Sequence, residues 1–263
     1  MSGWEALRRP SAANGIRVCV AHLKELPAER MLAVLSAPER VRAARIRHHE
    51  AWRQFVLTRG LLRLMLAHCT GAAPASFEID DAGGGAPYLT HNPWRVSFNV
   101  SHSHDYVAVA VGDEALGIDI ERIGLDGEWV PLAEVCFHPQ EQAFLAALPA
   151  TERAEGFTGI WTRKEARIKA TGEGFRTDPS RFSTVPFEGP VSVEDGRKGT
   201  QAWYTRPLST PAGYKAAIAS SGAASTITSV DAATILAQAP RMERGLQLST
   251  ATSTQMDRPA LQA

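Results

Sequence analysis

The sequence predicts an α+β fold built from two similar halves related by a pseudo-twofold axis, each with a small antiparallel sheet packed on a long helix. Two helical stretches end alike, at Thr70-Gly71 and at Thr171-Gly172. The segments that follow also match, since PASF at residues 74–77 is echoed by PSRF at residues 179–182. A run of three strands at residues 94–121 recurs at about 200–206, 213–219 and 226–231. Two similar halves follow from this repeated order of elements.

These repeats divide the 263-residue chain into four parts. Residues 1–14 are expected to form a loose lead-in, and residues 15–112 form the N-terminal half. Residues 113–237 form the C-terminal half, and residues 238–263, rich in Ser, Thr, Gln and Ala, are expected to be a disordered tail. A ligand site is expected in the cleft between the halves, where side chains from both can meet.

Composition argues against several classes of protein. The 28 basic residues balance the 28 acidic ones, which disfavours a general nucleic-acid-binding protein. The three cysteines, Cys19, Cys69 and Cys136, are far apart, so neither a disulfide framework nor a zinc site is expected, and a reducing cytoplasm fits. The first residues lack the apolar run of a signal peptide. The densest apolar stretch, LLRLMLAHC, is short and carries an arginine, so we expect no membrane span.

The N-terminal half opens with a strand, IRVCVAHL, in which apolar residues alternate. A helix is expected at about residues 27–34. Ser36-Ala37-Pro38-Glu39 is typical of a capping box with proline in the first turn, and it opens a helical region that continues to about His68. PASFEID then predicts a further strand. The glycine-rich DAGGGAPYL after it lacks the Lys-Ser or Lys-Thr ending of a P-loop, which argues against that nucleotide-binding fold.

The helical region that ends near His68 is dense in arginine. One face has the spacing of a packed core, and another is strongly basic. The region holds seven arginines: Arg40, Arg42, Arg45, Arg47, Arg53, Arg59 and Arg63. Arginine makes charge-assisted, bidentate contacts with phosphate, so a phosphate-rich ligand is one interpretation. The other is a basic face that is merely solvated, and the residues alone leave the two interpretations equal.

Residues 94–121 predict three strands, because apolar residues alternate and the turn-forming SHSHD and GDEAL interrupt them. An antiparallel meander with directly paired neighbours is the expected arrangement. Asp119 and Glu121 lie two apart on the third strand, so both carboxylates point to one face with Cα atoms roughly 6 to 7 Å apart. Such a pair repels unless a cation lies between them, and Mg²⁺ is a natural partner. Pairing with Lys or Arg on a solvated face is the alternative.

The helix expected at residues 151–172 contains WTRKEARIKAT. Trp161, Glu165 and Lys169 follow at i, i+4 and i+8, which places an aromatic, an acid and a base along one stripe. Taken alone, this spacing favours an ordinary surface pair of Glu165 with Lys169, worth only ~0.2 to 0.5 kcal/mol.

Four stretches in this order resemble the Sfp type of 4′-phosphopantetheinyl transferases. They are VSHSHDYVAVAV, GIDIE, WTRKEARIKATGEG and GYKAAIA. The resemblance covers most of residues 15–235 and implies the 4′-phosphopantetheinyl transferase fold. It also implies that Asp119, Glu121 and Glu165 bind Mg²⁺. The chain length matches the two-half branch of the superfamily, whose members are usually monomers.

The resemblance further implies contacts with coenzyme A. Basic residues of the arginine-rich segment are expected at its 3′-phosphate, and this role carries over to Arg53 and, less directly, to Arg40 and Arg45. Ser101 and His102 match a serine and a histidine that contact its phosphates. For His102 the alternative is that the side chain only caps a turn.

One part of the coenzyme A pattern departs from the family. Gly85-Ala86-Pro87 stands where many members have Gly-Lys-Pro, so a lysine contact is lost, while backbone contacts around Gly85 and Pro87 are expected to survive. Lys164 is a second candidate phosphate contact. Lys169 is expected to contact phosphate and to support the charge that develops at the attacked phosphorus. Glu165, or a water that it holds, is the candidate general base.

The implied reaction is transfer of the 4′-phosphopantetheine arm of coenzyme A to a serine of an apo acyl or peptidyl carrier protein. Adenosine 3′,5′-bisphosphate is the second product, and a cytoplasmic enzyme of secondary metabolite biosynthesis is the expected setting. Two alternatives stay open. A metal-dependent phosphohydrolase would use the same acids on water, and a degenerate carrier-binding module would bind without turnover.

Overall fold

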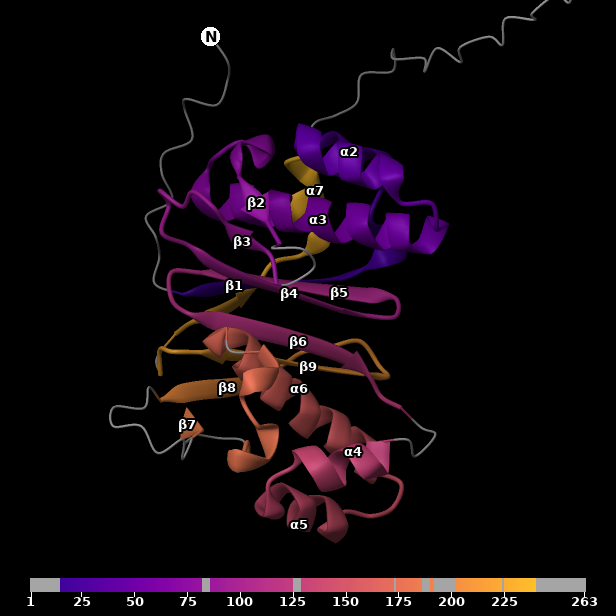
Figure 1. Ribbon diagram of the computed structural model, residues 1–263, viewed down its shortest axis with the longest axis vertical. Coiled ribbons are helices and arrows are strands. Elements are labelled where there is room, and N and C mark those ends of the chain that lie inside the picture. Colours follow the sequence, from indigo (N-terminus) through magenta and orange to yellow (C-terminus); the bar gives the residue numbers. More distant parts are fainter. Residues whose placement is uncertain are drawn as a thin grey trace, which may run out of the picture.

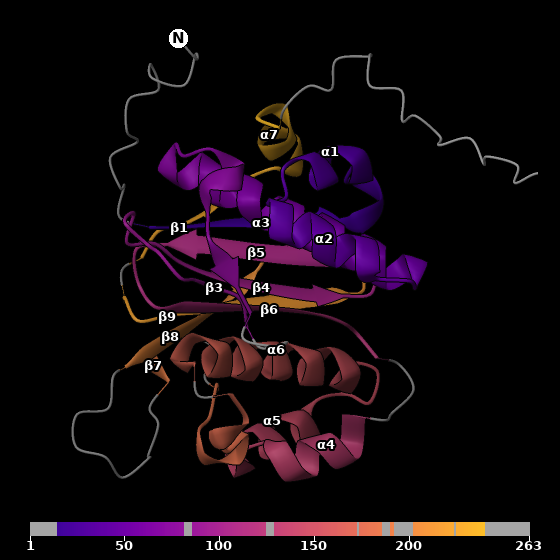
Figure 2. The same ribbon diagram turned by 45° about the horizontal axis from the view of Figure 1, so that its top comes forward.

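The computed structural model of the chain describes residues 15–81, 86–124, 129–172, 174–185, 190–191, 202–223 and 225–239. Four layers lie on one another in the order helix, sheet, sheet, helix (Figures 1 and 2). One apolar core lies between the first long helix and its sheet, and another lies between the two sheets. The α+β fold expected from the repeats is confirmed.

The N-terminal half follows the expected order of elements, with one break. Its capping box is present, since the Glu39 carboxylate accepts a hydrogen bond from the Ser36 backbone N–H at 2.9 Å. The expected helical region is two helices, because the backbone is extended at Ile46 and His48. The elements are β1 (Ile16–His22), α1 (Ala28–Ala33), α2 (Ala37–Arg45), α3 (His49–Thr70), β2 (Ile79–Asp80), β3 (Tyr88–Leu89), β4 (Ser97–Ser103) and β5 (Tyr106–Gly112), with 3₁₀ turns at Leu23–Glu25 and Pro74–Ser76.

The C-terminal half repeats this order around a second long helix. The strands expected at about 200–206 and 213–219 are present as β8 and β9. The elements are β6 (Leu116–Arg122), α4 (Trp129–Cys136), α5 (Pro139–Ala147), α6 (Arg153–Thr171), β7 (Pro190–Val191), β8 (Trp203–Leu208) and β9 (Tyr214–Ser220), with 3₁₀ turns at Gly174–Arg176 and Pro179–Arg181. Two further elements, β10 (Ile227–Ser229) and α7 (Ala232–Ala237), end the described chain.

The two halves share one topology. The order β1–β5–β4 in the first sheet corresponds to β6–β9–β8 in the second. Both long helices end at a glycine in the left-handed conformation, with φ of 74° at Gly71 and 69° at Gly172. A glycine adopts this conformation without steric cost, which accounts for the repeated Thr-Gly endings.

A buried cation ties the long helix to its neighbours in the N-terminal half. The Arg63 guanidinium pairs with Glu39 at 2.5 Å. It also donates to the carbonyl oxygens of Pro74 at 2.6 Å and Phe77 at 3.0 Å. Because Glu39 is the capping-box acid of α2, one network joins α2, α3 and the 3₁₀ turn.

Lys164 holds the equivalent place in the C-terminal half. Its ammonium pairs with Glu141 at 2.7 Å and donates to the carbonyl oxygens of Pro179 and Phe182, both at 2.7 Å. Glu141 is the capping-box acid of α5, where it accepts from the His138 backbone N–H. The PASF and PSRF segments therefore supply equivalent acceptors, which explains why one echoes the other.

The third strand of the expected meander belongs to the other sheet. β5 pairs with β4 and β1, whereas β6 pairs with β9, so the second expected pairing was wrong. The physical reason is that Ile118 and Ile120 of β6 bury face to face against Ala108 and Ala110 of β5. β6 contacts β4 through side chains instead of by backbone pairing. For example, the Asn99 Oδ1 of β4 accepts a hydrogen bond from the Ile118 backbone N–H of β6 at 3.1 Å.

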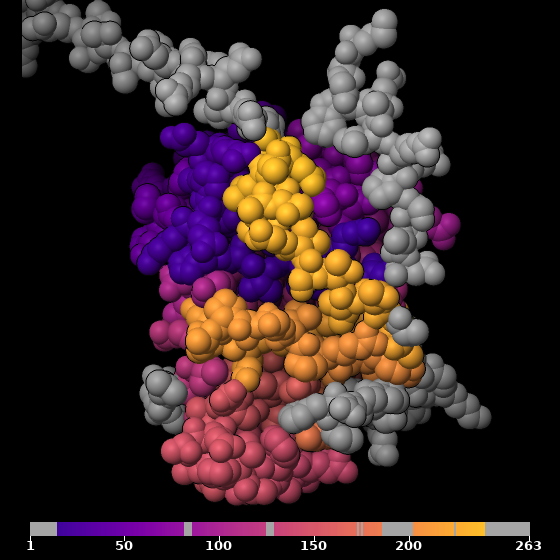
Figure 3. All heavy atoms as spheres, turned by 180° about the vertical axis from the view of Figure 1, so that it is seen from behind, coloured from indigo at the N-terminus to yellow at the C-terminus, as the bar shows by residue number. Residues whose placement is uncertain are grey.

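The last described segment returns to the N-terminal half. β10 pairs in parallel with β1, and Ala232 and Ile235 of α7 are buried in the core under α3. Figure 3 shows this segment, in yellow, lying over the indigo N-terminal half. Residues 225–239 therefore complete the N-terminal half. The expected boundaries, 15–112 for the N-terminal half and 113–237 for the C-terminal half, are corrected accordingly. β10 covers an edge of β1 that would otherwise leave backbone groups unpaired.

Two of the expectations from the sequence concern residues outside the described part of the chain. The lead-in at 1–14 is one, and residues 240–263 of the expected tail are the other. Ala239, inside the expected tail, is buried. None of the helices in the described ranges combines the length and apolar character needed to cross a bilayer.

Candidate active site

The strand alternation of β6 puts the two predicted strand acids on one face. Ile118 and Ile120 turn into the core between the sheets. Asp119 and Glu121 therefore turn the opposite way, toward α6 and away from that core. Asp119 is almost completely buried, at 1% exposed, whereas Glu121 is half-buried.

A glycine allows α6 to lie directly on this face of β6. A Cβ added at Gly117 would lie 2.1 Å from the carbonyl oxygen of Ala166 and 2.5 Å from the backbone nitrogen of Ala170. Only a residue without a side chain fits so close to another backbone. This approach brings Glu165 and Lys169, one turn apart on α6, to the strand acids, as the stripe in the sequence predicts.

Asp119 is the centre of a closed set of polar contacts. Its Oδ1 pairs with the Lys169 Nζ at 2.6 Å and accepts from the Ser101 hydroxyl at 2.8 Å. The Lys169 Nζ also donates to the Ser101 Oγ at 3.0 Å. Ser101 comes from β4, so one carboxylate joins β4, β6 and α6.

Asp119 lies close enough to Glu121 and Glu165 to raise the proton affinity of both. Burial raises the pKa of Asp119, against the lowering effect of the Lys169 ammonium and the Ser101 hydroxyl. Burial also raises the pKa of Glu121, and the charges of Asp119 and Glu165 raise it further, although a hydrogen bond with Ser103 opposes them. Burial and then Asp119 raise the pKa of Glu165. Three acids that disfavour one another's charge make a site that favours a cation.

The donor set fits a divalent metal ion chemically. The Oδ2 of Asp119 is buried and has no hydrogen-bond partner among the described residues. Carboxylate oxygens are the ligands that Mg²⁺ prefers. Across the described part of the chain no three His, Cys, Asp or Glu side chains already surround a point where an ion would lie, so these donor atoms would have to draw together.

A pocket of about 390 Å³ lies between α2, α3 and β4, and His102 and Pro87 line it. Arg42 and Arg59 supply its basic groups, and Phe55 lies beneath both guanidinium groups, at 4.8 Å and 5.8 Å from its ring centre. His102 and Pro87 thus line one pocket together with basic residues of the helical segment, and their expected contacts with coenzyme A stay predictions. Gly85 lies outside the described residues.

His102 is held by a residue of α3. The Gln54 amide nitrogen lies 2.8 Å from the His102 Nδ1, so the ring accepts this hydrogen bond. Desolvation lowers the pKa of His102, and the Lys169 ammonium lowers it further, with Asp119 opposing. The ring therefore lies within electrostatic reach of Lys169 and Asp119.

The arginines expected at coenzyme A lie in different surroundings. Arg53 lines a neighbouring pocket of about 670 Å³ that shares Gln54 with the first. Arg40 is exposed and donates to the Leu35 carbonyl oxygen, and Arg45 is exposed on α2. As far as the described pockets go, neither Arg40 nor Arg45 lines the pocket of His102. Their expected phosphate contacts stay predictions.

Sequence reasoning missed how part of the basic segment is used. Arg59 and Arg63 are buried and pair with Glu39, so they belong to the core of the fold. Arg42 is half exposed and pairs with Asp81, which also contacts Arg59 at 3.4 Å. The signal for Arg42 was present, since it stands among the seven arginines, but the spacing alone did not separate it from its neighbours.

Lys164 requires a correction. It was expected to contact a phosphate, but its side chain is completely buried, and Glu141 and two carbonyl oxygens surround its ammonium. The ring of Phe182 lies 4.4 Å below it. Lys164 is therefore a structural residue of the C-terminal half.

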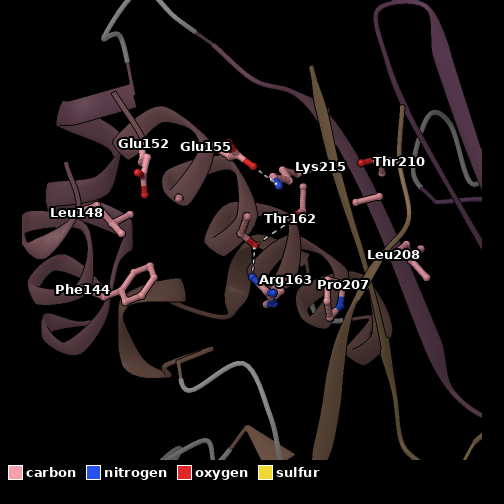
Figure 4. A pocket seen from close by; sticks show the side chains of 13 residues that line it. Phe144, Leu148, Glu152, Glu155, Thr162, Arg163, Pro207, Leu208, Thr210 and Lys215 are labelled. Carbon is pink, nitrogen blue, oxygen red and sulfur yellow. Dashed lines mark hydrogen bonds and ion pairs between the residues drawn. The ribbon is translucent and has the colours of Figure 1, made fainter. Parts of the chain in front are cut away.

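A separate pocket of about 370 Å³ lies between α5, α6 and the β8–β9 hairpin. Figure 4 shows Lys215 reaching across from β9 to Glu155 on α6, at 2.5 Å. Arg163, which lines this pocket, stands two positions before Glu165, so roughly 200° of helix rotation separates the two side chains. The pocket therefore opens on the other side of α6 from Glu165, although Lys215 is the cross-strand neighbour of Glu121.

Comparisons with known proteins agree with this geometry. A family model described as the 4′-phosphopantetheinyl transferase superfamily matches residues 115–219, and one described as 4′-phosphopantetheinyl transferase, N-terminal, matches residues 25–114. The two matches meet where the chain passes from the first sheet to the second.

Curated relatives carry the same description. The 4′-phosphopantetheinyl transferase HetI of Nostoc sp. is 32% identical over 59% of this chain and 72% of its own length. A 4′-phosphopantetheinyl transferase of Bacillus subtilis is 30% identical over 63% of this chain and 73% of its own length. The transferase Sfp of Bacillus subtilis strain 168 is 27% identical over 72% of this chain and 84% of its own length. The chain belongs to the 4′-phosphopantetheinyl transferase superfamily.

Proposed function

We propose that this chain transfers the 4′-phosphopantetheine arm of coenzyme A to a serine of an apo acyl or peptidyl carrier protein, leaving adenosine 3′,5′-bisphosphate. One observation carries the proposal. Asp119, Glu121, Glu165 and Lys169 share one face beside a pocket that His102 and basic residues line. A cluster of acids next to a basic pocket suits a ligand whose phosphates need both a cation and positive side chains.

Coenzyme A would lie with its phosphates toward His102 and Arg42. The ion-pair network behind the pocket contains three guanidinium groups, of Arg42, Arg59 and Arg63, against two carboxylates, of Glu39 and Asp81. One net positive charge therefore remains, and Arg42 is the exposed end of the network. This arginine would compensate for the lysine that Ala86 replaces, and Arg53 in the adjoining pocket would reach the 3′-phosphate.

Asp119, Glu121 and Glu165 would hold Mg²⁺. When bound, this ion would neutralise charge on the pyrophosphate as the leaving phosphate departs. The Oδ2 of Asp119, which has no hydrogen-bond partner among the described residues, would be one of the ligand atoms. Ser101 keeps the other oxygen of that carboxylate fixed.

Glu165 would act as the general base. Its carboxylate lies one helical turn from Lys169 and within electrostatic reach of Asp119, where it, or a water that it holds, would take a proton from the carrier serine. The serine oxygen of the carrier would attack the phosphorus next to the pantetheine arm while Glu165 takes the serine proton. The bond from this phosphorus to the bridging oxygen breaks, and its electron pair leaves with adenosine 3′,5′-bisphosphate. Lys169 would hold the charge that develops on the attacked phosphoryl group.

We also propose that the chain works as a monomer. Both halves that frame the site belong to one chain, and residues 225–239 complete the first half after the second is finished. A cytoplasmic location stays a prediction from the cysteines.

The test is to incubate the protein with coenzyme A, Mg²⁺ and an apo carrier protein and to weigh the carrier. We expect a mass gain of one phosphopantetheine, and no gain with Asp119→Asn. A carrier that stays unmodified while coenzyme A is cleaved would favour the phosphohydrolase alternative. Binding of the carrier without any change in either molecule would favour the degenerate binding module.

A further inference from the structure

Lys169 lies beside the carboxylate of Asp119, which has almost no access to water. The side chain of Asp119 is 2% exposed and that of Lys169 is 28% exposed, and their charged atoms are 2.6 Å apart. The hydroxyl of Ser101 closes a triangle with both. A buried carboxylate without a cation is costly, so this contact supports Asp119 in the protein as it stands.

The contact leaves room for a second cation. Lys169 and Ser101 both use the Oδ1 of Asp119, while the Oδ2 has no hydrogen-bond partner among the described residues. Burial raises the pKa of both Glu121 and Glu165, and both lie near enough for the charge of Asp119 to raise the pKa further. The Lys169 ammonium is thus a single positive charge near three acidic side chains.

We propose that Lys169 is the resident counter-cation of Asp119 in the metal-free protein and that Mg²⁺ competes with it for the three acids. The proposal rests on the proposed function, in which these acids bind Mg²⁺. Lys169 is partly exposed and its ammonium is carried on a flexible stem, so it can leave Asp119 for solvent or for a ligand phosphate while α6 stays in place. Metal binding would then free the lysine for the phosphoryl group.

Removing the charge of Lys169 should move two measurable quantities in opposite directions. Without a metal, Asp119 would lose its counter-cation, so the melting temperature in chelator should fall. With Mg²⁺, the ion would meet three acids and no competing ammonium, so it should bind more tightly, on the order of tenfold. A lysine that only contacts a ligand phosphate would change neither quantity when no ligand is present.

The experiment compares melting temperatures in EDTA and in a fixed millimolar concentration of Mg²⁺, without coenzyme A. Lys169→Met removes the charge, and Lys169→Arg keeps it. Arg181→Met is the matched control, because Arg181 also pairs with a carboxylate, Asp178, but in the 3₁₀ turn at Pro179–Arg181 after α6 and not beside the acids. A tenfold gain in affinity is worth ~1.4 kcal/mol at saturating metal, so the rise from EDTA to Mg²⁺ should be roughly 3 to 6 °C larger in Lys169→Met than in wild type. Lys169→Arg and Arg181→Met should rise as wild type does.

Two results would overturn the inference: a melting temperature of Lys169→Met in EDTA that equals wild type, or a Mg²⁺-dependent rise no larger than that of wild type. If Lys169→Met fails to fold in EDTA, the double variant Lys169→Met with Asp119→Asn decides, because it removes both charges. Folding of the double variant supports the counter-cation role, and failure of both variants to fold overturns it. The carrier assay on wild type judges the proposed function separately, whichever way the melting comparison falls.

Discussion

Substitution of Lys164, which forms a buried ion pair with Glu141, tests whether this lysine is structural or binds a ligand. Lys164→Met removes the ammonium but keeps an unbranched side chain, and it leaves Glu141 where both side chains are 0% exposed. Removing one partner of a buried ion pair costs about 3 to 5 kcal/mol. At ~2 to 4 °C for each kcal/mol in a chain of this size, the melting temperature should fall by roughly 6 to 20 °C.

The assay has two readouts, thermal unfolding and calorimetric affinity for coenzyme A at a temperature where the variant is folded. The affinity should stay close to that of wild type, because Lys164 faces Glu141 and two backbone carbonyls. Lys215→Met serves as the control for the melting temperature, since its pair with Glu155 is 36% and 56% exposed and should contribute no more than ~1 kcal/mol. A Lys164→Met protein that has the melting temperature of wild type but no longer binds coenzyme A would refute the structural role.

Three further outcomes follow from the structure. Arg53→Ala should weaken coenzyme A more than 3′-dephospho-coenzyme A, because a charge-assisted arginine–phosphate contact is worth ~1.5 to 3 kcal/mol; equal weakening of both ligands in calorimetry would place Arg53 elsewhere. Gly117→Ala should lower the melting temperature and the transfer rate together, since the added Cβ meets the backbone of α6 at 2.1 Å, and overpacking typically costs ~1 to 3 kcal/mol. Wild-type values for that variant would contradict the close approach. Truncation after Ala239 should leave the melting temperature and the transfer rate nearly unchanged, whereas truncation after Gly222 should lower the melting temperature by exposing the edge of β1 and the core under α3; equal melting of the two truncated chains would show that β10 and α7 contribute nothing.

Local patterns in the sequence predicted what local geometry controls. The alternation around Asp119 and Glu121 and the helical stripe of Glu165 and Lys169 identify faces of single elements, and each face lies where it was expected. The Thr-Gly endings predicted two equivalent helices, because a left-handed glycine is a local requirement of a helix end.

Features that depend on distant partners were not predictable in this way. The alternation of β6 is the same whether the strand extends the first sheet or packs on it, so the change of sheet at residues 113–115 left no signal. The partner of β10 is a strand about two hundred residues earlier, and its short apolar run resembles any third strand. Lys164 has helical spacing next to Glu165, and spacing does not reveal that its ammonium meets Glu141 in the core.

The central claim is that Asp119, Glu121 and Glu165 act as one metal site, and the affinity of Asp119→Asn for coenzyme A with and without Mg²⁺ tests it most directly. The substitution keeps the shape of the side chain and removes the charge of the most buried of these three acids. The wild-type protein should bind coenzyme A more tightly when Mg²⁺ is added, and the variant should lose this gain. A variant whose affinity still rises with Mg²⁺ as it does in wild type would contradict the metal site and the mechanism built on it.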